Sequence, residues 1–139
     1  MRISTDLALM DIAMIHHFLS TQSTWALGIP LATVERSLQH SLCFAGFDDN
    51  GRQIAFARVI SDHATFAYLV DVFVLPEQRG LGHSKALVQA VMDHPQLQGL
   101  RRFMLASANA RDLYQRYGFS APSKPEILMG INRPGVYQQ

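Results

Sequence analysis

Residues 71–92 contain the feature that most constrains the fold of this chain. An apolar, strand-like run ends at Pro76, and a short turn with Gly80 and Gly82 follows it. Apolar residues then recur at helical spacing: Ala86, Leu87, Val88, Ala90, Val91 and Met92. The stretch therefore predicts a strand that is joined by a tight loop to the N-terminus of a helix.

Such a loop is suited to bind an anion. The start of a helix leaves about four backbone N–H groups unpaired and carries roughly half a positive charge. Gly80 and Gly82 have no Cβ, so a phosphate can approach the backbone closely, and Arg79 and Lys85 add positive side chains. The loop predicts a phosphate or pyrophosphate site. The alternative is that these glycines serve only to form the turn.

Two common phosphate-binding loops fit this sequence poorly. The dinucleotide fingerprint requires Gly or Ala at the position of Lys85 and an acidic residue about twenty positions later. A Walker loop requires Gly-Lys followed by Ser or Thr, whereas the order here is His83-Ser84-Lys85. Neither type of nucleotide site is predicted.

A third pattern fits better. Arg79-x-x-Gly82-x-Ser84, preceded by Val-Phe-Val-Leu-Pro-Glu, resembles the Arg/Gln-x-x-Gly-x-Gly/Ala signature of the GCN5-related N-acetyltransferases (GNAT family). In that family the signature binds the pyrophosphate of acetyl-CoA; here the small residue Ser84 replaces the final Gly or Ala. Downstream, residues 113–119 resemble the family's Leu-Tyr-x-x-x-Gly-Phe segment. The resemblance extends from about Phe56 to Phe119, roughly half of the chain.

The length and composition favour one compact domain over residues 1–139. The hydrophobic content is 48% and the charged content 17%, which argues against disorder. Twelve basic and eleven acidic residues nearly balance, so neither a nucleic acid nor a membrane surface is expected as a partner. Cys43 is the only cysteine and lies in an apolar run, which predicts a buried, inert thiol. No signal peptide or membrane span is predicted, and we expect a cytoplasmic protein.

The order of elements predicts an α+β fold. The expected helices are 5–19, 31–39, 82–93 and 110–117, and the expected strands are 42–47, 53–60, 65–75, 102–106 and 127–131. A single mixed, mostly antiparallel sheet with helices on both faces follows from this order. The resemblance implies the GNAT fold, in which two strands splay apart. The family's usual first strand would have to fit into the first four residues, so we expect it to be vestigial or absent.

The resemblance also implies which residues bind acetyl-CoA. Backbone groups of the strand before the loop would contact the pantetheine arm and the thioester, and the loop itself would hold the pyrophosphate. Asn109 would lie near the pantetheine, and Tyr114 near the sulfur. In chain order these are Val72, Phe73, Val74, Arg79, Gly80, Leu81, Gly82, His83, Ser84, Asn109 and Tyr114. The spacing from Asn109 to Tyr114 is shorter than in most relatives.

Two side chains are candidates for catalysis. Tyr114 matches the family position of the general acid that protonates the departing thiolate; its alternative role is a packed helix aromatic. Asp71 interrupts an apolar strand beside the expected thioester, where a desolvated carboxylate is suited to accept a proton. Equally, Asp71 could form a structural ion pair with Arg58. The histidines show no metal-ligand spacing, so no metal is predicted.

The sequence thus predicts an acetyl-CoA-dependent N-acetyltransferase acting on the primary amine of a small molecule by direct attack in a ternary complex. One alternative is a CoA-binding module without turnover. Another is an acyltransferase that uses a different acyl donor or a protein amine. The resemblance is also compatible with a homodimer, a state common among relatives.

Overall fold

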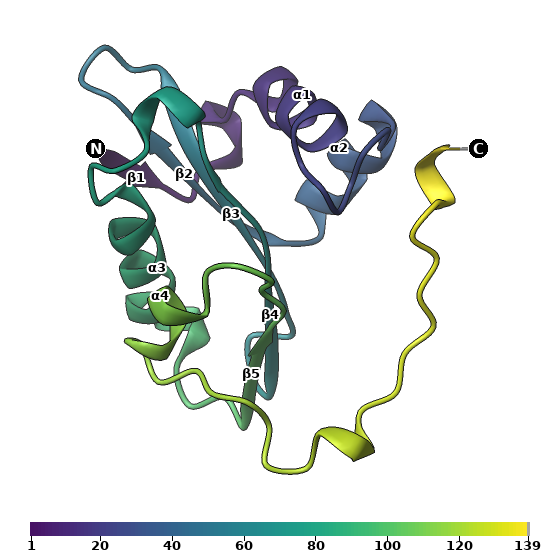
Figure 1. Ribbon diagram of the computed structural model, residues 1–139. Coiled ribbons are helices and arrows are strands. Elements are labelled where there is room, and N and C mark those ends of the chain that lie inside the picture. Colours follow the sequence, from purple (N-terminus) through teal and green to yellow (C-terminus); the bar gives the residue numbers. More distant parts are fainter. Residues whose placement is uncertain (139) are drawn as a thin grey trace.

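The computed structural model describes residues 1–138, which form one five-stranded sheet with helices on both faces (Figure 1). The strands lie in the spatial order β1 (Arg2–Ser4), β2 (Leu42–Phe47), β3 (Gln53–Ser61), β4 (Phe66–Val74) and β5 (Arg102–Leu105). Neighbouring strands are antiparallel except β4 and β5, which are parallel. The predicted α+β fold with a mostly antiparallel sheet is confirmed.

Two pairs of helices enclose the sheet. Helices α1 (Ile12–Thr21) and α2 (Leu31–Gln39) lie on one side of it, and α3 (His83–Asp93) and α4 (Arg111–Gln115) lie on the other (Figure 1). Short 3-10 turns complete the elements: Leu7–Leu9, Pro76–Gln78, Pro95–Leu97, Pro125–Ile127 and Val136–Gln138. Among residues 1–138 no helix is long and apolar enough to span a bilayer.

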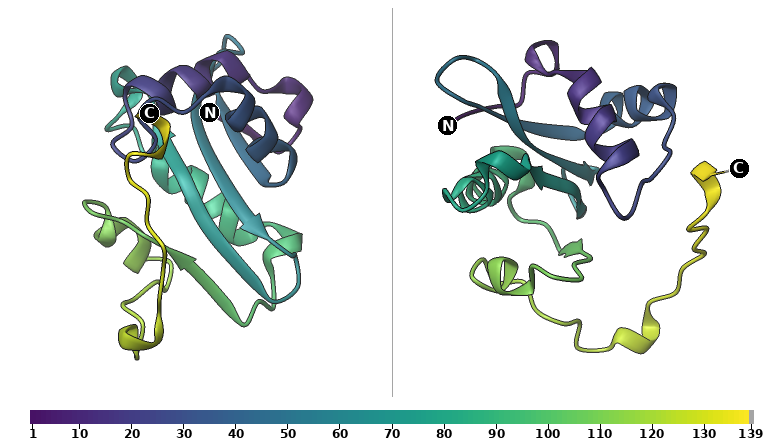
Figure 2. Two further views of the ribbon diagram at one scale, coloured as in Figure 1. Left: turned by 90° about the vertical axis from the view of Figure 1, so that its right-hand side faces the viewer. Right: turned by 45° about the horizontal axis from the view of Figure 1, so that its top comes forward.

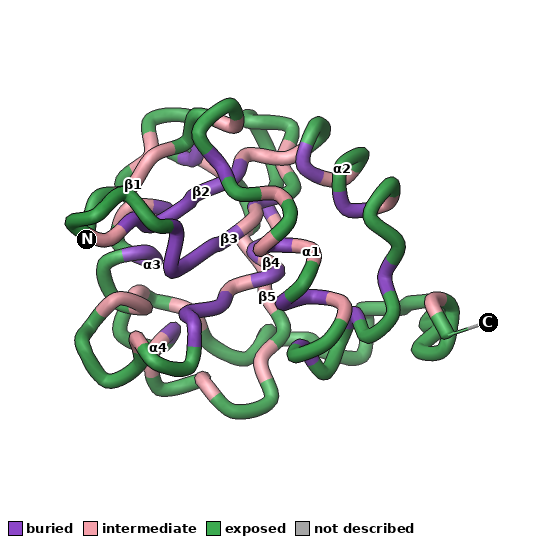
Figure 3. Tube along the Cα trace, turned by 90° about the horizontal axis from the view of Figure 1, so that it is seen from above, coloured by how far each residue is buried: buried purple, intermediate pink, exposed green. Residues whose placement is uncertain are grey.

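The sheet separates two hydrophobic cores because successive strand residues point to opposite faces. On β3, Ile54 and Phe56 pack in the core under α1 and α2, whereas Ala55, Ala57 and Val59 pack in the core under α3 and α4. Both sets of side chains are fully buried. Buried residues therefore run along β2 and β3 (purple in Figure 3), which places these strands between the two cores.

The first strand is short, as expected, whereas the first helix differs from the prediction. A three-residue strand β1 is present and pairs antiparallel with β2, with Ile3 opposite Gly46. The helix expected over 5–19 is divided, because two aspartates cap separate turns. Asp6 accepts a hydrogen bond from the Ala8 N–H, and Asp11 accepts one from the Met14 N–H, each at 3.0 Å. Each carboxylate satisfies an otherwise unpaired N–H, so a 3-10 turn forms first and α1 begins at Ile12.

The prediction of a last strand at residues 127–131 is wrong. Residues 125–127 form a 3-10 turn, and the chain then continues extended without a ladder partner among residues 1–138. A strand requires a neighbour to accept and donate its backbone hydrogen bonds, and the sheet does not extend beyond β5. We call residues 120–138 the C-terminal arm. It runs along one side of the molecule, apart from the sheet (yellow in Figures 1 and 2).

β4 contains a bulge just after the point where its ladder to β5 ends. Phe56 pairs with Phe73 and Arg58 pairs with Val70, so β4 has one residue more than β3 between these pairs. The ladder between β4 and β5 ends where Leu69 meets Leu105, while β4 continues to Val74. Residues 70–74 therefore have no strand on their β5 side, and the two parallel strands part there.

Candidate functional site

The loop between β4 and α3 is held open by two glycines. Gly80 has a φ angle of 79° and Gly82 one of 81°, in the left-handed region that residues with a side chain rarely adopt. A Cβ placed on either glycine would meet no atom within 4 Å. The space beside this backbone is therefore open on the outside of the turn, as the prediction of a phosphate site requires.

The backbone N–H groups of residues 80–85 have no hydrogen-bond acceptor within residues 1–138. These N–H groups belong to the loop after Arg79 and to the first turn of α3. The N-cap residue Gly82 has no side-chain oxygen that could accept their hydrogen bonds. The N–H of Arg79 is not part of this group, because it donates to the Pro76 carbonyl at 3.3 Å. The free amides form a run of donors at the positive end of a helix.

A cavity of about 270 Å³ lies against these amides. Its lining includes the cations Arg79, Lys85 and Arg116 and no carboxylate. The remaining lining residues are Val74, Gln78, Gly80, Gly82, His83, Ser84 and Leu113. The electrostatic potential of this cavity therefore suits an anion.

Leu113 on α4 and Arg116, the C-cap of that helix, also line this cavity and are absent from the predicted site. They lie three positions apart, on one face of the short helix, and Arg116 occupies a variable position of the Leu-Tyr-x-x-x-Gly-Phe segment. The hydroxyl of Tyr117 donates to the Lys85 carbonyl at 3.0 Å and so ties α4 to the first turn of α3. Helical spacing counted from the motif could have indicated Arg116.

The predicted pantetheine strand is present, and its side chains are mainly structural. Phe73 stacks on Phe18, with ring centroids 3.9 Å apart and planes within 9°. Val74 lines the loop cavity, and its carbonyl accepts a hydrogen bond from Arg79 Nε at 3.1 Å. Val72 is half-buried. No strand pairs with their backbone on the β5 side beyond Leu69, as the predicted contacts to a thioester require.

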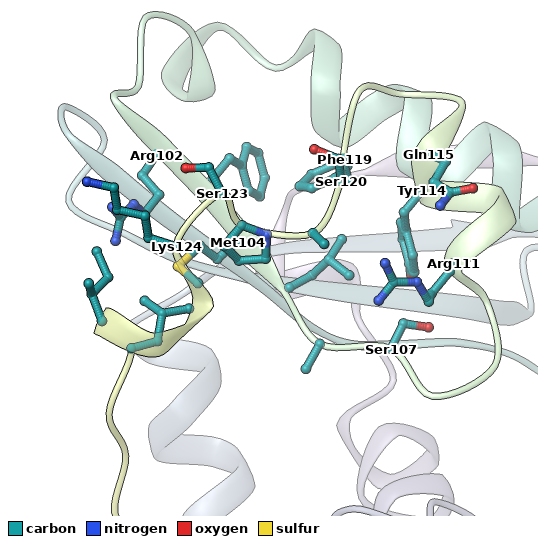
Figure 4. Close-up of a pocket in the computed structure, with 17 residues that line it drawn as sticks. Arg102, Met104, Ser107, Arg111, Tyr114, Gln115, Phe119, Ser120, Ser123 and Lys124 are labelled. Carbon is teal, nitrogen blue, oxygen red and sulfur yellow. The ribbon is translucent and has the colours of Figure 1, made fainter.

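Tyr114 lies in a second, larger cavity of about 690 Å³ (Figure 4). This cavity is bounded by β5, by α4 and by residues 119–128, and Ser107 and Arg111 also line it. The ring of Tyr114 is 8% exposed and packs edge-on against Phe119, with centroids 6.1 Å apart. Burial raises the pKa of Tyr114 above its ordinary value, so the phenol is protonated at neutral pH.

The side chains of two other residues predicted to contact acetyl-CoA, Leu81 and Asn109, are exposed to solvent. Asn109 is exposed on the loop after β5 and lines neither cavity. Leu81 points its side chain outward and is exposed, although its amide belongs to the free run. Within residues 1–138 no group of three or more His, Cys, Asp or Glu side chains is placed to hold one metal ion.

Asp71 sits at the β4 bulge with a φ angle of 57°, which is unusual for a residue other than glycine. Its side chain is 8% exposed, and both oxygens accept hydrogen bonds, one from Trp25 Nε1 at 2.7 Å and one from Arg58 Nε at 2.8 Å. Arg58 also donates to Ser41 Oγ at 3.0 Å. The ion pair with Arg58, the alternative offered by the sequence, is thus present. The partner Trp25, 46 positions away, could not be found from sequence spacing.

Cys43 is buried beside this ion pair. Burial raises the pKa of Cys43 to about 11, against the opposing effect of Arg58, and Asp71 raises it further. The thiol is therefore protonated at neutral pH and unsuited to act as a nucleophile.

Comparisons with known proteins agree with this geometry. The chain matches the model of the Acetyltransferase (GNAT) family over residues 12–119. A Gibberella zeae protein assigned as an acetyltransferase is 32% identical over 133 residues, which span 81% of this chain and 74% of that protein. A Mycobacterium tuberculosis protein solved in complex with CoA and NLQ has the same fold, with a TM-score of 0.71 at 15% identity over 86% of this chain and 72% of that chain.

The crystal structure of a protein assigned to the GNAT family in Xanthomonas campestris superimposes with a TM-score of 0.97 at 62% identity. The superposition covers 99% of this chain and 96% of that chain. The family match and these relatives show that the chain belongs to the GNAT family of acetyltransferases.

Proposed function

We propose that the protein is an acetyl-CoA-dependent N-acetyltransferase that acetylates the primary amine of a small molecule. The observation that supports this most is the run of free amides at residues 80–85, which opens onto a cationic cavity beside the parted end of β4. Free N–H groups at a helix N-terminus suit a diphosphate, the group that joins the two halves of CoA. Binding there would direct the pantetheine arm along the unpaired side of β4.

The proposed transfer occurs directly between the two bound substrates. The amine nitrogen attacks the thioester carbon, and a backbone N–H on residues 72–74 donates to the oxygen that becomes negative. Loss of one such donor typically costs about 3 kcal/mol of transition-state stabilisation. When the carbon–sulfur bond breaks, Tyr114 gives its proton to the sulfur, and the amine loses its own proton to the surrounding solvent or a base. The buried ring and the cavity-facing position of Tyr114 support this role.

For Asp71 the geometry supports a positioning role more than that of the base. Both of its oxygens already accept hydrogen bonds shorter than 3 Å, one from Arg58 and one from Trp25. We propose that Asp71 stabilises the bulge that parts β4 from β5 and holds Trp25, which is half-exposed, near the site. Loss of this carboxylate would then affect both stability and turnover.

Replacement of Tyr114 by phenylalanine is expected to lower kcat about a hundredfold while CoA affinity stays within about twofold, because general acid catalysis contributes on the order of 10² or more. Steady-state kinetics and calorimetric titration with CoA measure the two quantities. Tyr137→Phe is the matched control, since it removes a hydroxyl from the far end of the arm and should leave kcat unchanged. Equal kcat for Tyr114→Phe and the unaltered enzyme would remove Tyr114 from the acid role.

A library of small amines tests the proposed function itself. The enzyme is incubated with acetyl-CoA and each amine, and release of CoA thiol is followed together with the mass of the acetylated product. We expect at least one amine to be acetylated. Tight binding of CoA without turnover of any amine would favour a CoA-binding module. Turnover with another acyl-CoA alone would contradict acetyl-CoA as the donor.

A further inference from the structure

The cavity that contains Tyr114 is positively charged. Its charged lining residues are Arg102, Arg111 and Lys124. The acidic residues nearest to them in sequence, Asp112 and Glu126, do not line this cavity. The remaining polar side chains of the lining are uncharged hydroxyls and an amide: Ser107, Tyr114, Gln115, Ser120 and Ser123. The cavity of about 690 Å³ therefore contains cations and uncharged groups and no carboxylate.

The three cations have no acidic partner within residues 1–138. The ion pairs of this part of the chain join Arg52 to Glu77 and Arg58 to Asp71. In the same range, the arginine side chains that donate hydrogen bonds are those of Arg52, Arg58 and Arg79. The positive potential of the cavity is therefore not neutralised by a neighbouring group. An ammonium ion that enters the cavity is repelled unless the same molecule carries negative charge.

Arg111 lies at the end of the cavity where acetyl transfer is proposed. It is three positions before Tyr114 on α4, so both side chains project from one face of that helix. Figure 4 shows the guanidinium of Arg111 at the same end of the cavity as Tyr114 and Ser107. The Ser107 hydroxyl oxygen accepts a hydrogen bond from the Ala110 N–H at 2.9 Å, and its O–H can still donate to a ligand. A fork of N–H donors and a hydroxyl thus lie beside the proposed general acid.

The positive charge extends to the other end of the cavity, where Arg102 and Lys124 lie (Figure 4). A polyamine carries several ammonium groups and would meet repulsion at both ends. A zwitterion or an anion would be attracted, so the cavity selects acceptors by their charge. The same cations disfavour the ammonium form of a bound amine and favour its uncharged form, which is the nucleophile. This effect offsets the lack of a carboxylate base in the lining.

We propose that the acceptor is an amine that also carries a carboxylate, as amino acids do, and that Arg111 binds this carboxylate. The guanidinium presents two parallel N–H groups that match the two oxygens of a carboxylate, and such charged pairs are among the strongest hydrogen bonds. Arg111 takes no part in bond formation; it holds the carboxylate so that the amine nitrogen lies near the thioester carbon and Tyr114. This acceptor class rests on the proposed N-acetyltransferase function and specifies it further.

Calorimetric titration of the protein–CoA complex with pairs of compounds tests the carboxylate site. Each pair is an amino acid and its carboxamide, such as alanine with its amide and β-alanine with its amide, and CoA replaces acetyl-CoA so that no transfer occurs. For at least one pair we expect the acid to bind at least about tenfold more tightly, because hydrogen bonds to charged groups are the stronger kind. Arg111→Gln should remove this preference, and the fold should persist because Arg111 is exposed. Arg101→Gln is the matched control and should keep the preference, since Arg101 is also exposed but lines neither cavity.

Acetylation of the same compounds with acetyl-CoA separates the acceptor class from the proposed function. We expect kcat/KM to be at least about tenfold higher for the acid of a pair than for its amide, and Arg111→Gln to raise KM with kcat within about threefold. Preferential binding of acids without acetylation of any of them would support the carboxylate site and contradict the proposed function. Amides or polyamines acetylated as efficiently as acids would overturn the carboxylate-bearing acceptor, as would a panel in which no acid binds more tightly than its amide. An acid preference retained by Arg111→Gln would exclude Arg111 as the ligand.

Discussion

Replacement of Gly82 by glutamate is expected to abolish CoA binding. The carboxylate would enter the open space beside the loop and oppose a diphosphate with like charge, within a cavity that otherwise contains only cations and neutral groups. For the unaltered protein, CoA at a hundred times its dissociation constant should add about 2.7 kcal/mol to the free energy of unfolding. For Gly82→Glu, thermal unfolding with and without CoA should coincide.

Gly99→Glu separates this effect from backbone strain. Gly99 has a φ angle of 71° and, like Gly82, no atom within 4 Å of the position that a Cβ would take. Glutamate should therefore cost roughly 1–2 kcal/mol of conformational energy at either position. Gly99 lines neither cavity, so its variant should bind CoA as the unaltered protein does. Retained CoA binding by Gly82→Glu would show that the phosphate groups do not lie at this loop.

Replacement of Arg58 by alanine is expected to lower the free energy of unfolding by about 3–5 kcal/mol. The change would leave Asp71 buried and charged, with only the hydrogen bond from Trp25. In a chain of this size such a loss corresponds to a fall of roughly 10 °C or more in Tm. Urea denaturation followed by circular dichroism measures the free energy directly.

The exposed ion pair between Arg52 and Glu77 provides the matched control. The distance from Arg52 Nη2 to Glu77 Oε1 is 3.0 Å, close to the 2.8 Å between the charged atoms of Arg58 and Asp71. The side chains of Arg52 and Glu77, however, are 58% and 52% exposed. Arg52→Ala should cost less than about 1 kcal/mol, because solvent screens such pairs. Similar losses for Arg58→Ala and Arg52→Ala would contradict the stabilising role given to the pair at the bulge.

The parts of the fold that local pattern determines could be predicted from the sequence. Two runs separated by the Asp48–Gly51 turn indicated β2 and β3, and the glycines of the loop indicated both the start of α3 and the open backbone beside it. The bounds of α2 and β2 agree with the prediction because Pro30 and the Asp48–Gly51 turn delimit them. The phosphate loop could be predicted for the same reason: its chemistry resides in consecutive residues.

The remaining features depend on contacts between distant parts of the chain. The hydrogen bond from Trp25 to Asp71 joins residues far apart in sequence, and no spacing rule predicts it. Residues 127–131 have the pattern of a strand, but a pattern cannot show whether an edge of the same chain lies within reach. The divided first helix depended on whether Asp11 would cap a helix or lie within one, and the hydrogen bond that its carboxylate accepts from Met14 decided this.

A crystal structure of the protein with bound CoA would locate the diphosphate and the sulfur. We expect the diphosphate oxygens to accept hydrogen bonds, at about 3 Å, from backbone N–H groups of residues 80–85. We also expect the sulfur to lie beside residues 72–74, where β4 has parted from β5. A diphosphate bound elsewhere, with these amides still lacking an acceptor, would contradict the proposed site.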